Sequence, residues 1–105
     1  MVSIADLAAA ARKASVVEIE IAGHKVHMRS FIGAEQRALI ERNKAGDPMS
    51  ATEIMAIGLC TPEGLPLMTV EEAEQFPGDE IVRVGKEIMR HSGMLPEAQD
   101  AAVKN

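Results

Sequence analysis

The chain has 105 residues, the size of one small domain that can bury a core without metal or disulfide support. Its net charge is −5, its basic residues are scattered, and its only aromatic residues are two Phe, so it lacks the basic, aromatic face of a nucleic-acid binder. The single cysteine, Cys60, cannot form an internal disulfide, which favours a reducing, cytoplasmic setting. No apolar run is long enough to span a membrane.

The N-terminal stretch predicts a first helix from Ile4 to about Lys13, with Ser3 as its N-cap. Its apolar stripe is thin, so we expect this helix to fray or to dock only in an assembly. The stripe consists of Ile4, Leu7, Ala8 and Ala11.

Residues 16–29 alternate between apolar and polar side chains and predict two half-buried strands joined by a tight turn. A turn at Gly23-His24 is the first choice, and it would place Ile21 opposite Val26. A turn at Ala22-Gly23 gives the same faces but requires an unfavourable backbone angle of Ala22, so it ranks second. No other segment reads as a strand, and the two free edges of this hairpin predict self-association.

The rest of the chain predicts helices separated by turns. We expect a helix over 33–44 with a solvent-exposed Glu35. The capping box Ser50-Ala51-Thr52-Glu53 predicts the start of a second helix that runs to about Cys60. A short helix from Thr69 to about Gln75 and a last helix from Glu80 to His91 follow. The expected core positions of the last helix are Ile81, Val84, Gly85 and Ile88.

The predicted fold class is therefore α+β, with one antiparallel β-hairpin followed by a small helical bundle. We expect residues 1–95 to form a single domain and residues 96–105 to form a mobile tail.

No residue pattern indicates an enzyme, a metal site or a cofactor site. His24 and His27 are three residues apart on a predicted strand, which points them to opposite faces. Cys60 ends an apolar helix and reads as a buried, inert thiol. The acidic clusters 71–74 and 79–80 lie in first helical turns, where carboxylates complement the helix dipole.

Two apolar surfaces are the candidates for partner binding. One is the apolar face of the hairpin, and the other is the connector around Pro66. Packing against the core is the favoured interpretation of the connector, while exposure would make it a binding surface. The candidate residues are Ile19, Ile21, Val26, Met28, Leu65, Leu67 and Met68.

The order of these features resembles the tail assembly chaperones of long-tailed bacteriophages and prophages. The hairpin EIEIAGHKVHMRSF precedes the helix GAEQRALIER, and IMAIGLCTPEGLPLMTVEEAEQF then leads into IVRVGKEIMRHSG. The resemblance covers roughly residues 16–95. The chain departs from the family pattern at two places. Cys60-Thr61-Pro62 stands where an Asp-containing segment is commoner, and Met68 replaces the usual aromatic residue before the Thr. The matching residues are Gly23, Arg29, Gly58-Leu59, Glu63-Gly64, Pro66-Leu67, Thr69 and Ser92-Gly93.

The resemblance implies a factor of the host cytoplasm that binds the helical tape measure protein and helps recruit tail tube subunits. It implies binding without ATP, and the chain contains no phosphate-binding loop. A homo-oligomer is expected, with neither nucleic acid nor membrane as a partner. The alternative is a small prophage-encoded regulatory or adaptor protein that acts by protein–protein interaction.

Overall fold

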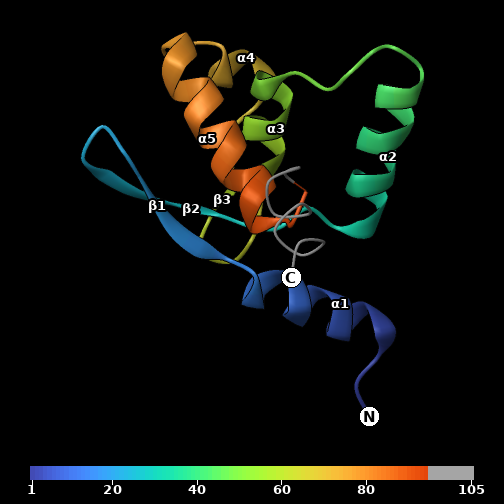
Figure 1. The fold of residues 1–105 in the computed structure, drawn as a ribbon. Helices are drawn as coiled ribbons and strands as arrows, with labels where there is room; N and C mark the ends of the chain where they lie inside the picture. The colour runs from blue at the N-terminus through green and yellow to red at the C-terminus, as the bar shows by residue number, and fades with distance from the viewer. Residues whose placement is uncertain (95–105) are drawn as a thin grey trace, which may run out of the picture.

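The computed structural model describes residues 1–94, and both Leu95 and the tail predicted over 96–105 lie outside this range. The described part contains five helices and three strands (Figure 1). In chain order they are α1 (Ile4–Ala14), β1 (Val17–Ile21), β2 (His24–Met28), α2 (Gly33–Lys44), α3 (Ala51–Gly58), β3 (Leu59–Cys60), α4 (Val70–Ala73) and α5 (Gly78–His91). The predicted α+β class is confirmed.

The β1–β2 hairpin turns at Ala22-Gly23, so the first-choice turn at Gly23-His24 is wrong. Ile21 pairs with His24 and Ile19 with Val26. Ala22 and Gly23 have φ values of 52° and 81°, both in the left-handed region that a type I′ turn requires. The chain accepts this angle at an alanine, and the register that results leaves the apolar and polar faces of the hairpin unchanged.

A third strand, which the alternation of the sequence did not predict, pairs with β2. Met28 and His27 pair with Leu59 and Cys60, and the amide of Arg29 donates to the carbonyl of Gly58 at 3.0 Å. The expected helix through Cys60 therefore ends at Gly58. After a turn the chain runs back along β3, where Cys60 and Pro66 form a single bridge and the Leu67 amide donates to the Leu59 carbonyl at 3.3 Å.

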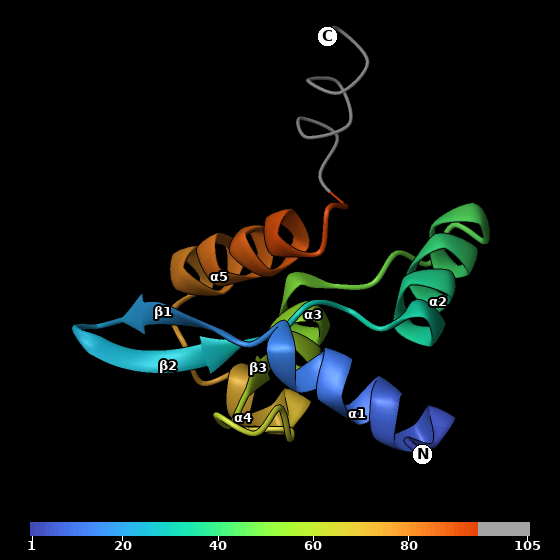
Figure 2. The ribbon, with the colours of Figure 1, turned by 90° about the horizontal axis from the view of Figure 1, so that it is seen from below.

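The core lies between the hairpin, α3 and α5 (Figures 1 and 2). Met55, Leu59, Val84 and Ile88 are fully buried within it. The predicted stripe of α5 is confirmed, because Ile81, Val84, Gly85 and Ile88 are all buried. Three helices begin where their capping residues predict: Ser3, Ser50 and Thr69 each accept a backbone amide at the start of α1, α3 and α4. The last helix begins at Gly78, two residues before the predicted Glu80.

Helix α1 is the exception to this packing, since none of its residues is buried. Its C-terminal end lies against the turn at Gly64, where Arg12, Lys13 and Val16 are close neighbours. Its N-terminal half points away from the rest of the fold (Figure 2), and Ile4 and Leu7 are exposed. This matches the thin apolar stripe seen in the sequence. Within residues 1–94, no helix is both long and apolar enough to cross a membrane.

Candidate functional site

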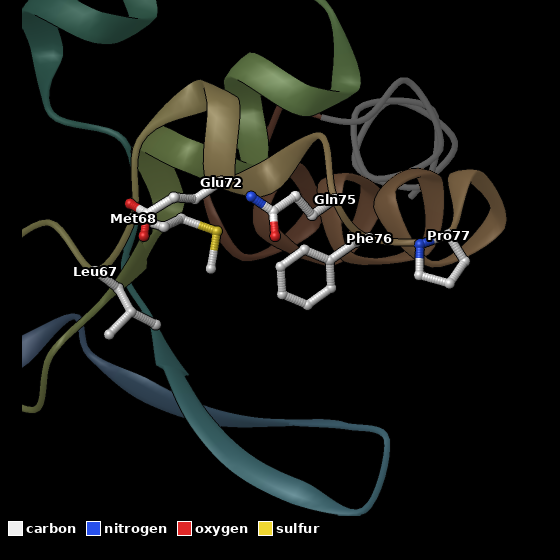
Figure 3. Close-up of a pocket in the computed structure, with 6 residues that line it drawn as sticks. All are labelled: Leu67, Met68, Glu72, Gln75, Phe76 and Pro77. Carbon is white, nitrogen blue, oxygen red and sulfur yellow. The ribbon is translucent and has the colours of Figure 1, made fainter.

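A groove of about 480 Å³ opens beside α4. Figure 3 shows the side chains of Met68, Gln75 and Phe76 projecting to one side of the α4 segment, with Leu67 at one end and Pro77 at the other. The lining is mainly apolar with two polar groups, and it consists of Leu67, Met68, Glu72, Gln75, Phe76 and Pro77.

The local sequence places these side chains together. Thr69 and Glu72 form a capping box, in which the Thr69 hydroxyl accepts the Glu72 amide and the Glu72 carboxylate accepts the Thr69 amide at 2.9 Å. Met68 precedes the N-cap of α4, Glu72 lies within the helix, and Gln75 and Phe76 follow its end, so the groove is lined by the short helix and by the segments on both sides of it. At the other end, the bond from Leu67 to Leu59 ties the connector to the sheet.

The structure separates the seven predicted partner-binding residues into two groups. Leu65 and Leu67 are 62% and 42% exposed, so the favoured interpretation that they pack into the core is wrong for these two residues. Met68 is half-buried and lies in the groove with Leu67.

The hairpin residues lie elsewhere. Ile21 and Met28 are each only 7% exposed and belong to the core, and Ile19 and Val26 are half-buried against it. These four hairpin residues therefore pack in or against this chain's own core, and the exposed residues among the seven candidates are Leu65 and Leu67 of the connector.

Four of the six groove residues were not predicted from the sequence. Glu72, Gln75, Phe76 and Pro77 were interpreted only as a helix start and its end. No local pattern in the sequence groups them, because only Glu72 lies within α4, whereas Gln75 and Phe76 follow that helix and Pro77 is the N-cap of α5.

A second hollow of about 320 Å³ lies between α1, the turn at Gly64 and the start of α2. Its floor holds a two-pronged ion pair, in which both terminal nitrogens of Arg29 bind the carboxylate of Glu35 at 2.8 Å. The side chains of Arg29 and Glu35 are only 9% and 23% exposed, so the prediction of a solvent-exposed Glu35 is wrong. Glu35 also accepts the amide of Ile32, which caps α2.

Burial raises the pKa of Glu35, but the hydrogen bonds from Arg29 and Ile32 and the guanidinium charge outweigh it and hold this pKa below its usual value. The hydrogen bonds between Arg29 and Glu35 also raise the pKa of Arg29 above its usual value. Because the guanidinium and the carboxylate satisfy each other's charge and hydrogen-bonding groups, we interpret this pair as a structural link between β2 and α2.

The remaining chemically versatile side chains are dispersed or buried. Cys60 is 1% exposed, as expected, and its burial raises the pKa of the thiol, so it is protonated at neutral pH. His91 Nε2 lies 2.6 Å from the carbonyl oxygen of Ser15, where it ties the end of α5 to the end of α1. Among residues 1–94, no three His, Cys, Asp or Glu side chains are grouped so as to hold a metal ion.

The connector and its groove thus form an accessible apolar site among the described residues, and its chemistry suits binding. Comparison of the chain with protein-family models, with curated proteins and with solved structures gave no match.

Proposed function

We propose that this protein is a tail assembly chaperone of a bacteriophage or prophage. It binds the helical tape measure protein, helps recruit tail tube subunits and acts by binding alone, without ATP or catalysis. The observation that carries the proposal is the order of features along the chain. A hairpin followed directly by Arg29 precedes a helical part, and the stretch from Gly58 through Thr69 then leads into a last helix that is followed by Ser92-Gly93.

The exposed connector supports this proposal. Leu65 and Leu67 present apolar side chains to solvent, and Leu67 lines the groove together with Met68 and Phe76. Helix-in-groove binding uses such surfaces, and a flexible Met side chain adapts to different apolar partners along a long helical protein.

Co-expression tests the proposal. The chain should be produced with the long helical protein encoded next to it, with a tag on the chain only. We expect the tape measure protein to stay in solution and to co-purify with the chain, and to precipitate when it is expressed alone. A tape measure protein that neither binds nor gains solubility would contradict the proposal.

A matched pair of variants tests whether the connector is the surface used. Leu67→Ser removes an apolar side chain that is 42% exposed in the groove, and Ile40→Ser removes one that is 48% exposed on α2. We expect Leu67→Ser to weaken co-purification and Ile40→Ser to leave it unchanged, with both variants keeping melting temperatures close to that of the parent. Equal effects of the two variants would remove the connector from the binding surface.

A further inference from the structure

The groove lies in the part of the chain that carries its negative charge. Residues 61–82 contain six of the 16 acidic residues and none of the 11 Lys and Arg residues. The rest of the chain is nearly neutral, because it holds the other 10 acids and all of the bases. The six carboxylates are Glu63, Glu71, Glu72, Glu74, Asp79 and Glu80.

Exposed apolar side chains lie in the same segment of the sequence as these carboxylates, namely Leu65, Leu67 and Val70. Glu71 on α4 and Glu74 just after it are both exposed, and along the chain they adjoin the lining residues Glu72 and Gln75. The helix dipole and the capping box account for acids in the first turn of α4. They do not account for Glu74, which follows α4, or for the exposure of large apolar residues among the acids. An exposed apolar patch with a polar rim is typical of a docking site.

We propose that the groove and its acidic rim bind an amphipathic helix that carries Lys or Arg beside its apolar stripe. The inference rests on the proposed function for the identity of the partner, which is then a basic helical segment of the tape measure protein. The partner's apolar side chains lie against Leu67, Met68 and Phe76, and its cations lie near Glu71 and Glu74. The carboxylates act by screened attraction at the surface, so they select the charge of the partner and speed its encounter with the groove.

A pair of synthetic peptides tests the charge and the apolar stripe together. Both are 18-residue helices with Leu on one face, and one has Lys and the other Glu on the opposite face. We expect the Lys peptide to bind the full chain and to shift the NMR amide signals of Leu67, Glu72 and Gln75, with affinity that falls as salt is added. The Glu peptide should not bind.

Variants locate the binding and separate it from general attraction to a negative protein. The double variant Glu71→Gln/Glu74→Gln should weaken the Lys peptide about threefold to tenfold, since each exposed ion pair contributes modestly. The control Glu18→Gln/Glu41→Gln makes the same change in net charge on β1 and α2 and should have little effect. Leu67→Ser should also weaken binding, whereas Ile40→Ser should not.

Three results would overturn the inference. Equal binding of the Lys peptide and the Glu peptide would show that the groove does not select the charge of its partner. Equal loss from the two double variants would show non-specific attraction. Self-association of the chain that is abolished by both Ile4→Ser and Leu67→Ser would assign the groove to α1 of a second copy, because α1 exposes Ile4 and Leu7.

The outcomes also separate this inference from the proposed function. If the tape measure protein co-purifies equally with the parent chain, with Leu67→Ser and with Glu71→Gln/Glu74→Gln, the function stands and the assigned surface is wrong. If the Lys peptide binds at the groove as expected but no tape measure protein binds, the surface stands and the proposed function fails.

Discussion

At the scale of single residues, the two-residue turn between β1 and β2 places an alanine in the left-handed backbone region. Ala22 has a φ of 52°, where the side chain of an L-residue costs about 1 kcal/mol. We expect Ala22→Asn to raise the free energy of unfolding by about 0.5–1 kcal/mol, because Asn-Gly is the preferred pair for a type I′ turn. Urea denaturation checks this, and Ala34→Asn on exposed α2 should instead be neutral or destabilising. A loss of stability from Ala22→Asn would contradict the assigned turn.

The Arg29–Glu35 pair makes stability depend on pH. The pKa of Glu35 is lower in the folded chain than its ordinary value of 4.5, so the ionised carboxylate stabilises the fold above that pH. The stabilisation is lost as the pH falls through the folded-state pKa. We expect Glu35→Gln to lower the free energy of unfolding at pH 7 by about 2–3 kcal/mol, because it leaves the guanidinium of Arg29 without its anion.

The pH profile distinguishes this pair from a general effect of charge. Between about pH 5 and pH 3 the stability of Glu35→Gln should fall less steeply than that of the parent chain, as measured by denaturation at each pH. The control Glu41→Gln removes an exposed carboxylate from the same helix and should leave both the stability and the slope nearly unchanged. Parallel profiles for Glu35→Gln and the parent would contradict the pKa shift.

At the scale of elements, α3 and α5 meet through two glycines in different surroundings. A Cβ at Gly58 would lie 2.5–2.8 Å from three side-chain atoms of Ile88, whereas one at Gly85 would lie 3.6 Å from Ala51. We expect Gly58→Ala to lower the melting temperature, since the fully buried Ile88 must move and overpacking costs about 1–3 kcal/mol. Gly85→Ala should keep or raise it, because alanine favours a helix interior by up to about 1 kcal/mol. Thermal unfolding of both variants checks the contact, and equal melting temperatures would show that the helices are less closely packed.

Local patterns predicted most of the elements, and long-range pairing accounts for what they did not predict. The capping residues Ser50 and Thr69 and the stripe of α5 specify their helices within a few residues of sequence, so these predictions are confirmed. Strand β3 has only two residues, and its partners Met28 and His27 lie some thirty positions earlier in the chain, beyond the reach of any local periodicity.

The candidate site was predicted in part for the same reason. The apolar connector was evident from Leu65 and Leu67, but its exposure depends on how the chain returns along β3, which only the fold shows. The ion pair of Arg29 with Glu35 depends on the approach of β2 to the start of α2, so the charged pattern of α2 read as uniformly exposed.

At the scale of the whole molecule, the outer side of β1 has no strand partner among the described residues along its whole length. Strand β2 is covered by β3 at His27 and Met28, and β3 is covered by the returning chain at Pro66. In a hairpin with a two-residue turn, the backbone N–H and C=O groups of alternate residues point toward the partner strand. The backbone groups of Ile19 therefore hydrogen-bond to β2, whereas those of Glu18 and Glu20 point outward. Arg83 covers part of this edge by donating to the Glu20 carbonyl at 2.8 Å.

We expect the chain to self-associate at micromolar concentration by pairing β1 edges, and Glu18→Pro to remove this association. Proline at Glu18 deletes an outward-facing N–H and leaves the bonds of the hairpin intact, so the melting temperature should change little. Ile19→Pro deletes a bond to β2 and should destabilise the fold, which makes it the comparison for a proline in the same strand. Sedimentation velocity over a wide concentration range is the measurement. A monomer at every concentration, or an oligomer that Glu18→Pro does not change, would show that copies of this chain do not join through β1.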